Sequence, residues 1–338
     1  MKRAKENTTG STWLKSAVMA AVLIALVALL AGCESDEDCL NCVEPPIGEL
    51  PPPVVPTGVH TISGDNLVIV QWYDISYAPY DGTYSPNVEK YVIYSRFFEE
   101  GDQNDPNREF YYIGEVAWDE NYDDYTGLHW FDDIEVENGF RYEYAVAAVN
   151  AAGKESALSF ELVLDAPLPM SPYVNGNYIA VELFDGNGAQ ANKSGFDFAK
   201  AAANQGNINA GRVDPTVDPA DFVIYFENGV PYVDANPSRV VLQDFGVFTS
   251  GGSLIFEGVS WAPADGYSQT GKIELVAGHI YVVEIRGQAL HYAKFGVTGT
   301  YQDTVDIIWA YQTIPGLPEL KAPEDLETGP AKPQIVSF

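Results

Sequence analysis

The clearest structural signal in the chain is the stretch FDDIEVENGFRYEYAVAAVNAAG, residues 131–153. Apolar side chains recur at every second position of its latter half, at Tyr142, Tyr144, Val146 and Ala148, and this period is typical of a β-strand. An Asn-Gly pair before this run and an Asn-Ala-Ala-Gly sequence after it indicate turns. The stretch therefore predicts one strand bounded by two turns.

The same period-two pattern extends over residues 56–165. It recurs at Val68, Val70 and Trp72, and again in the run Tyr91–Tyr94, with clusters of glycine, asparagine and proline between the runs. Several short strands separated in this way indicate a β-sandwich, so we predict an all-β domain over these residues.

The residues quoted above resemble the fibronectin type III module. Residues 131–153 look like its sixth strand with the flanking turns, and Trp72 lies where that family places its core tryptophan on the second strand. The resemblance implies that Tyr142 is the tyrosine-corner residue, whose hydroxyl bonds back to the backbone near the turn. These are core and corner positions, so they describe the fold and not a function.

A proline-rich segment, LDAPLPMSP at residues 164–172, is predicted to link this sandwich to a second domain. Beyond it the chain again reads as strands, with one alanine-rich helical turn at residues 198–205. The predicted strands are 178–184, 222–227, 240–243, 254–259, 272–276, 280–285, 290–297 and 304–311. We therefore predict an all-β chain whose second antiparallel β domain spans residues 173–320.

This second domain resembles the haem-binding HmuY-like lipoproteins of bacteria. The resemblance rests on the motifs Gly278-His279-x-Tyr281-Val282-Val283, Tyr292-Ala293-Lys294 and Trp309-Ala310-Tyr311-Gln312. It implies haem as the ligand, and it nominates His279 and His291, the two histidines of the domain, to hold the iron.

Hairpin geometry argues against that pair. If Gly287 and Gln288 form the turn, His291 lies opposite Glu284, and His279 is five positions from Glu284 on the same strand. That separation is roughly 17 Å on the opposite sheet face, whereas the two axial ligands of one iron lie about 4 Å apart. We therefore predict that the two histidines do not share a haem, and we treat haem as a disfavoured cofactor.

The chain begins with a segment typical of bacterial export. An apolar run from Ala17 to Leu30 follows a basic leader and is shorter than the roughly 20 residues that span a bilayer. It ends at Leu30-Ala31-Gly32-Cys33, which resembles the bacterial lipobox, and the resemblance implies that Cys33 is diacylated and becomes the mature N-terminus. Residues 1–32 are therefore predicted to be a lipoprotein signal peptide. The alternative is an ordinary signal peptide with an incidental cysteine.

Residues 33–55 are predicted to form a tether, because like charges followed by prolines favour an extended chain over a packed one. Cys39 and Cys42 lie within it at C-x-x-C spacing without further metal ligands nearby, so they form a disulfide after export or have no role. Residues 321–338 are predicted to be a flexible tail. The predicted location is the bacterial cell envelope, lipid-anchored at the outer membrane or cell surface.

The chain is strongly acidic, with 18 Lys and Arg against 48 Asp and Glu and a formal net charge of −30. Such a surface repels phosphate backbones and anionic headgroups, so we predict no nucleic-acid partner and membrane contact only through the lipid. The acidity itself has two interpretations. It is either a solvated surface or a set of loops that hold divalent cations.

The most specific metal candidate is a set of alternating oxygen ligands typical of the start of a calcium loop: Asp119, Asn121 and Asp123. The pattern then departs from an EF-hand, because Asp124 replaces the expected glycine and Trp130 the expected glutamate. Calcium is therefore a weak prediction, and a solvated acidic loop is its alternative.

Two loops rich in tyrosine and aspartate lie at one pole of the sandwich in the topology that the resemblance implies. One follows Trp72 and carries Tyr77, Tyr80 and Tyr84, and the other spans residues 118–127. Tyrosine provides a large contact area at low entropic cost, so we predict that this pole is the ligand-facing surface of the first domain. The alternative is a crowded surface without a ligand.

No enzyme motif is complete in the sequence. The segment from Gly266 to Thr270 lacks the second glycine of a nucleophile elbow, and neither a zinc-protease motif nor a phosphate-binding loop occurs. We predict a non-catalytic binding or adhesion lipoprotein whose partner is an unknown protein, glycan or small molecule. The alternatives are a haem-uptake lipoprotein and a glycan-binding accessory protein.

Overall fold

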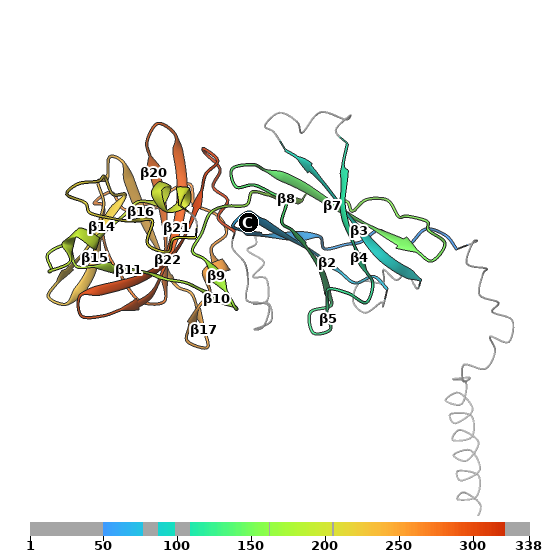
Figure 1. The fold of residues 1–338 in the computed structure, drawn as a ribbon, viewed down its shortest axis with the longest axis horizontal. Coiled ribbons are helices and arrows are strands. Elements are labelled where there is room, and N and C mark those ends of the chain that lie inside the picture. The colour runs from blue at the N-terminus through green and yellow to red at the C-terminus, as the bar shows by residue number, and fades with distance from the viewer. Residues whose placement is uncertain (1–49, 77–86, 99–108, 162, 205, 322–338) are drawn as a thin grey trace, which may run out of the picture. The chain divides into compact units, whose positions relative to one another are not determined.

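The computed structural model describes residues 50–76, 87–98, 109–161, 163–204 and 206–321. This part of the chain belongs to one compact unit that begins at Leu50, and it is built mainly of antiparallel strands (Figure 1). The prediction of an all-β fold is confirmed. The described residues contain no helix that is long and apolar enough to cross a membrane.

The first sandwich consists of two four-stranded sheets, in the orders β1-β2-β6-β5 and β4-β3-β7-β8. Successive pairs of strands alternate between the sheets, in the manner of a fibronectin type III-like sandwich. The bounds are β1 His60–Gly64, β2 Leu67–Tyr73, β3 Val88–Phe97, β4 Tyr111–Ala117, β5 Tyr122–Asp123, β6 Leu128–Asp133, β7 Tyr142–Asn150 and β8 Val163–Asp165.

One hydrophobic core fills the space between these two sheets. Trp72, Tyr91 and Tyr144 are fully buried in it, together with the alternating apolar residues of β2 and β7. At the turn before β7, the backbone N–H of Glu137 donates a hydrogen bond of 3.0 Å to the Tyr142 hydroxyl. That bond fixes the entry of β7 into its sheet.

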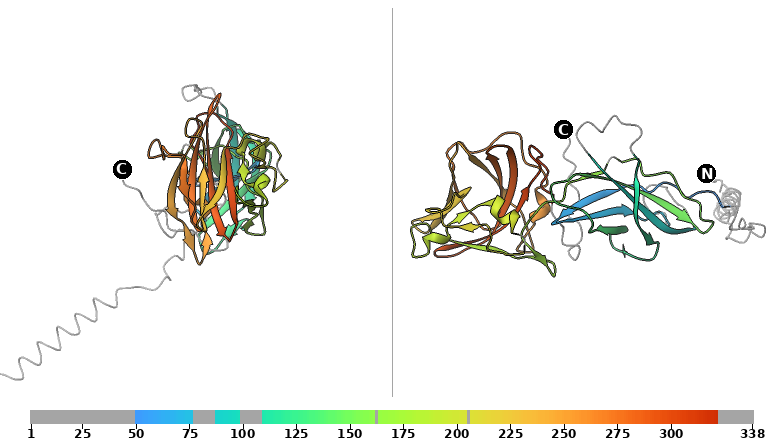
Figure 2. Two further views of the ribbon diagram at one scale, coloured as in Figure 1. Left: turned by 90° about the vertical axis from the view of Figure 1, so that its left-hand side faces the viewer. Right: turned by 45° about the horizontal axis from the view of Figure 1, so that its top comes forward.

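The second β domain contains two five-stranded sheets. The first, here called the long sheet, has the order β11-β22-β21-β20-β16, and its strands β20 to β22 run side by side in Figures 1 and 2. Its bounds are β11 Val181–Phe184, β16 Val240–Val247, β20 His279–Arg286, β21 Leu290–Thr300 and β22 Thr304–Gln312. The second sheet comprises β13 Arg212–Val213, β12 Gly195–Phe196, β14 Phe222–Glu227, β15 Val230–Asp234 and β19 Lys272–Glu274.

The long sheet is buried on both faces. Tyr281 and Phe295 point into a core that it shares with the second sheet, whereas Val282 and Ile308 point the opposite way into another core. Irregular segments cover this opposite face, here called the outer face, and they contribute Phe256 and other residues to its core. Because both faces are covered, these strands read as nearly continuous apolar runs.

Several predicted elements need correction. Residues 254–259 were expected to form a strand, but they contain the end of β18, Ser253–Leu254, and the 3-10 turn η4, Phe256–Gly258. Phe256 and Val259 are buried as part of the outer-face cover, which explains their apolar character. Strand β15 was not predicted, because Pro231 within it argues against a strand. Helix α2, Phe198–Ala203, occupies the predicted helical turn.

The segment predicted as a linker is packed instead. Leu168 and Met170 are buried in the outer-face core, and the backbone N–H of Tyr311 donates to the carbonyl of Pro169 at 2.9 Å. The segment lies along the edge of β22. Proline is tolerated there, because its nitrogen has no hydrogen to donate to a neighbouring strand and an edge position does not require one.

The predicted tether and tail are also shorter than expected. Leu50 and Pro53 are buried, and Asn150 Nδ2 donates to the carbonyl of Pro51 at 2.6 Å, so residues 50–55 pack rather than extend freely. At the other end, Lys321 Nζ donates to the carbonyl of Leu164 at 2.9 Å and lies 2.9 Å from the carboxylate of Glu319. The first residue of the predicted tail is thus bound within the fold.

Candidate functional site

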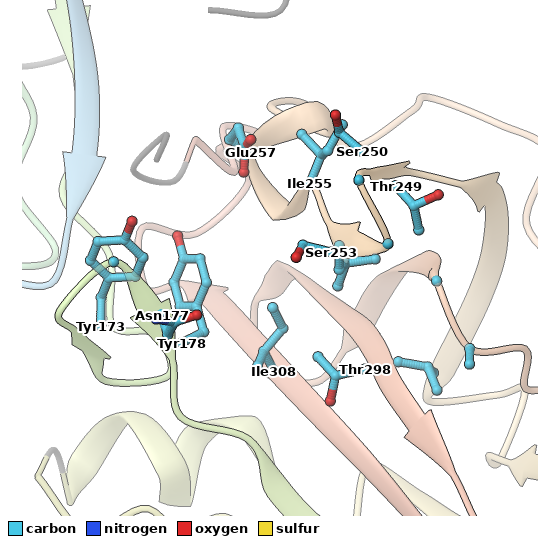
Figure 3. Close-up of a pocket in the computed structure, with 17 residues that line it drawn as sticks. Tyr173, Asn177, Tyr178, Thr249, Ser250, Ser253, Ile255, Glu257, Thr298 and Ile308 are labelled. Carbon is cyan, nitrogen blue, oxygen red and sulfur yellow. The ribbon is translucent and has the colours of Figure 1, made fainter. Parts of the chain in front are cut away.

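A cavity of about 670 Å³ lies on the outer face of the long sheet (Figure 3). Two short hairpins and the turn η4 form most of its wall, and Thr298 and Ile308 of the long sheet form its base. Its volume falls within the range of roughly 300–1,000 Å³ that is typical of small-molecule sites. We therefore treat it as the candidate ligand site and call it the outer-face cavity.

The first hairpin supplies an aromatic wall. Strands β9, Tyr173–Val174, and β10, Asn177–Tyr178, are joined by Asn175 and Gly176, both with positive φ, as a tight two-residue turn requires. The rings of Tyr173 and Tyr178 have centroids 4.7 Å apart and lie side by side in Figure 3. Tyr178 also contacts the ring of Phe256 edge-on at 5.2 Å, so the wall is anchored in the outer-face core.

The second hairpin supplies hydroxyl groups. Strand β17, Thr249–Ser250, pairs with β18 so that Ser250 lies opposite Ser253 across the turn Gly251–Gly252. Both glycines have positive φ, +58° and +91°. The hairpin lies close to the sheet because residue 296 is glycine, since a Cβ atom at Gly296 would overlap the side chain of Leu254.

A buried lysine stabilises the third part of the cavity wall, the turn η4. Lys294 of β21 is fully buried on the outer face, and its Nζ donates to the carbonyls of Phe256 and Val259, each at 2.7 Å. The same atom lies 4.3 Å above the ring centroid of Phe256. These bonds fix the backbone of η4 and thereby the position of Glu257 in the cavity wall.

Burial lowers the pKa of Lys294 to about 7, and the negative charge of Glu257 opposes this shift only in part. Burial also raises the pKa of the Tyr178 phenol above its usual value, so Tyr178 is neutral at physiological pH. Glu257 is then the single charged side chain among the described residues of the lining. The cavity combines hydroxyls, an amide, two phenol rings and one carboxylate.

The two histidines of the second domain lie outside this cavity. Arg286 pairs with Leu290, so the turn has three residues and His291 faces Ile285, not Glu284 as predicted. The corrected register places both histidines on the face toward the second sheet, six positions or about 20 Å apart along the strands. His279 Nδ1 lies 3.0 Å from the Asp244 carboxylate, and His291 Nδ1 lies 3.1 Å from the carbonyl of Gln312. The separate partners of His279 and His291 and the distance between them disfavour a shared haem. The absence of a shared haem stays a prediction, which a titration with haemin would test.

In the first sandwich, the candidate calcium ligands are engaged within their own loop. The Asp123 carboxylate accepts hydrogen bonds from Tyr125 N at 2.9 Å and Thr126 Oγ1 at 2.7 Å, and Asn121 Nδ2 donates to the carbonyl of Trp130 at 3.1 Å. Within the described ranges, no three His, Cys, Asp or Glu residues are grouped to hold a metal. This geometry favours the acidic-loop alternative.

Other predicted sites lie outside the described residues, and their roles stay predictions: Cys33, Cys39, Cys42, Tyr77, Tyr80 and Tyr84. The described ends of the two tyrosine-rich loops do meet, because Asp74 N donates to the carbonyl of Gly127 at 3.0 Å.

A buried polar cluster, which the sequence did not indicate, supports this junction. The Asp74 carboxylate accepts a 2.8 Å bond from the Tyr91 hydroxyl and lies 3.5 Å from Nε2 of the fully buried His129. Burial alone would raise the pKa of Asp74, but contacts with His129, Ser76 and Tyr91 outweigh it and lower the pKa to about 2.

No protein-family model and no curated protein matches the chain. A Fn3-like protein from Clostridium thermocellum is 18% identical, with 34% of this chain and 92% of that chain covered and a TM-score of 0.23. A human FNIII domain is 20% identical, covering 42% and 98%, with a TM-score of 0.23. A DUF4466 family protein from Parabacteroides merdae is 9% identical, covering 78% and 95%, with a TM-score of 0.36. These scores are too low to assign a function to the chain.

Proposed function

We propose that this protein is a non-catalytic, lipid-anchored binding lipoprotein of the bacterial cell envelope that holds a small ligand in the outer-face cavity. The observation that carries the proposal is the cavity itself. It is about 670 Å³ in volume, opens to solvent, and is bordered by two tight hairpins and a turn that Lys294 fixes. Walls fixed before the ligand arrives reduce the entropic cost of binding.

The composition of the lining supports binding rather than catalysis. General acid–base chemistry needs positioned groups within hydrogen-bond reach of the reacting atoms, and most glycosidases use a pair of carboxylates. Among the described lining residues, Glu257 is the only carboxylate, and no histidine or cysteine accompanies it. The Lys294 amine is bonded to two backbone carbonyls and does not line the cavity.

The haem-uptake alternative receives less support from the same lining. Haem carries two propionates, which favour cationic partners, and its iron is held in proteins by histidine, cysteine, methionine or tyrosine. The described lining offers no lysine, arginine, histidine, cysteine or methionine. Tyr173 and Tyr178 remain, but burial keeps the Tyr178 phenol protonated and therefore a poor iron ligand.

The lipid anchor is proposed from the lipobox-like sequence and is tested separately. Two acyl chains on Cys33 give stable membrane attachment, where one chain gives only marginal binding. In the expressing bacterium, a palmitate analogue should label the wild-type chain and not Cys33→Ser. Labelling of Cys33→Ser, or an unmodified mature N-terminus by mass spectrometry, would contradict the anchor.

The binding function is tested by filling the cavity. Ser253 is exposed and lines the cavity, so Ser253→Trp should occupy it without disturbing either core. Small molecules that co-purify with the full-length protein from its native cells should be identified by mass spectrometry and should be lost from Ser253→Trp. The matched control is Ser238→Trp, at an exposed turn outside the cavity lining. Equal retention by both variants would place the ligand elsewhere.

A further inference from the structure

We propose that the ligand of the outer-face cavity is a neutral carbohydrate. The inference rests on the proposed binding function and adds the chemical class of the ligand. Three properties of the described lining carry it: its charge, its hydroxyl groups and its aromatic wall.

The charge of the lining disfavours anions. The one charged group among the described lining residues is Glu257, and the buried Lys294 directs its amine to the carbonyls of Phe256 and Val259. An anionic ligand would be repelled by Glu257 and would find no lysine, arginine or histidine among the described lining residues. The net charge of −30 adds to this repulsion over longer distances. The ligand is therefore neutral or cationic.

The polar groups favour a ligand with many hydroxyls. Thr249, Ser250 and Ser253 of the second hairpin line the cavity, as do Asn177 of the first hairpin and Thr298 of the long sheet. Asn177 Nδ2 donates to the carbonyl of Asn175 at 3.0 Å and Thr298 Oγ1 to that of Asp306 at 3.3 Å, so the second hairpin supplies most of the hydroxyls offered to a ligand. A hydroxyl group both donates and accepts, as does a side-chain amide, and each therefore complements a sugar hydroxyl in either role. The Glu257 carboxylate can accept from such a hydroxyl in a charge-assisted bond, which is stronger than a neutral one.

The tyrosines provide a surface for the apolar face of a sugar ring. The faces of aromatic rings carry negative electrostatic potential and attract the polarised C–H groups of a pyranose. Tyr173 is partly exposed beside the cavity, and its contact with Tyr178 holds the ring in place. Both residues come from one tight hairpin, so this surface is rigid.

A cationic ligand is a weaker fit. An ammonium group would interact with Glu257 and with the ring faces, as in aromatic cages. It would make little use of the hydroxyls and amide that form the rest of the polar lining. A neutral sugar uses the carboxylate, the hydroxyls and the rings together.

The test is a binding measurement on the full-length lipoprotein in a detergent without a sugar headgroup. Isothermal titration and saturation-transfer NMR would compare neutral mono- and oligosaccharides with their uronic-acid and amino-sugar counterparts. We expect a neutral sugar to bind at least tenfold more tightly than its anionic counterpart. Tyr173→Ala and Ser253→Trp should each weaken binding tenfold or more, and Tyr173→Phe, which keeps the ring, should weaken it less.

Two controls match these variants. Tyr301→Ala removes an exposed tyrosine outside the cavity lining, and Ser238→Trp adds a tryptophan at an exposed turn. Both should leave the affinity unchanged. Circular dichroism and the melting temperature of each variant would establish that loss of binding is not loss of fold.

The outcomes separate this inference from the function on which it rests. Preference for an amine or an anion, lost in Ser253→Trp, would overturn the carbohydrate assignment and keep the cavity as the ligand site. Sugar binding that is equal in Tyr173→Ala, Ser253→Trp and the wild type would place the sugar elsewhere and also overturn the assignment. Binding of no sugar, together with loss of no co-purified molecule in Ser253→Trp, would overturn both proposals.

Discussion

Burial disfavours the charged form of both Asp74 in the first sandwich and Lys294 in the second domain, but only Asp74 has partners that outweigh this effect. Asp74 receives a hydrogen bond from the Tyr91 hydroxyl and bonds from the backbone and side chain of Ser76, and its pKa falls to about 2. Lys294 has two carbonyls as partners, and burial lowers its pKa to about 7. One site therefore stabilises the charged form, and the other disfavours it.

The difference reflects how each sheet is covered. In the first sandwich the core lies between two sheets, and the polar cluster sits at the junction of two loops. In the second domain the outer face is covered by irregular segments, whose backbone carbonyls must find donors away from water. Lys294 supplies such donors from within the sheet. Two hairpins of this irregular cover also form part of the cavity wall.

The largest expected effects come from removing one large ring from each core. Trp72 and Phe256 are both fully buried, so Trp72→Ala and Phe256→Ala should each lower the free energy of unfolding by about 3–5 kcal/mol. Only Phe256→Ala should also weaken ligand binding, because its ring supports Tyr178 and Lys294. Urea unfolding with a binding titration on each folded variant measures both effects. Equal loss of binding in Trp72→Ala would contradict the separation of the two regions.

The contrast between regular sheets and irregular covering segments also explains what could be predicted from the sequence. Regular strands with a clear period were predictable, since Trp72 and Tyr144 alternate with their neighbours and the runs of β20 to β22 are long and apolar. The irregular segments that cover the outer face were not predictable, because residues 254–259 show no regular hydrophobic repeat. Their conformation depends on tertiary contacts with Gly296 and Lys294.

One signal for the cavity wall was present in the sequence. A lysine inside the apolar run YAKFGV, residues 292–297, must be paired when both faces of the strand are buried. The sequence shows the lysine but not its partners, which lie 35 and 38 residues away. The position of His291 was misjudged for a simpler reason, since one extra residue in the turn after Arg286 shifts the whole register.

The next effect in size concerns Lys294 and pH. Its pKa is about 7 in the folded chain and near 10.5 when unfolded, so the unfolded chain binds more protons between these values. The contribution of Lys294 to stability should therefore rise as the pH increases from 7 toward 10.5, by an amount on the order of a few kcal/mol. Urea unfolding at pH 7 and pH 9 should show this increase in the wild type and not in Lys294→Met. An identical pH dependence in the two proteins would argue that the amine keeps its ordinary pKa.

Asp74 should give a smaller effect of the same sign, since its contribution to stability also rises with pH, but in the acid range. Its folded pKa of about 2 lies below the unfolded value of 3.8, so its contribution is present above pH 3.8 and is lost as the pH falls toward 2. Asp74→Asn should lower stability at pH 7 by about 1–3 kcal/mol, because bonds to a charged group are lost. It should also flatten the acid limb of the stability curve. Asp119→Asn, at an exposed position of the neighbouring loop, is the matched control and should change neither.

The smallest effect should come from calcium at Asp119, Asn121 and Asp123. Both Asp123 oxygens already accept bonds from Tyr125 N and Thr126 Oγ1, and the Asn121 amide donates to the Trp130 carbonyl. A ligand that binds only the folded state raises stability by RT ln(1 + [L]/Kd), so a true site must raise the melting temperature at saturation. We expect the same melting temperature in saturating calcium and in EDTA. An increase with calcium that disappears in Asp123→Ala would restore the loop as a cation site and give the first sandwich a ligand of its own.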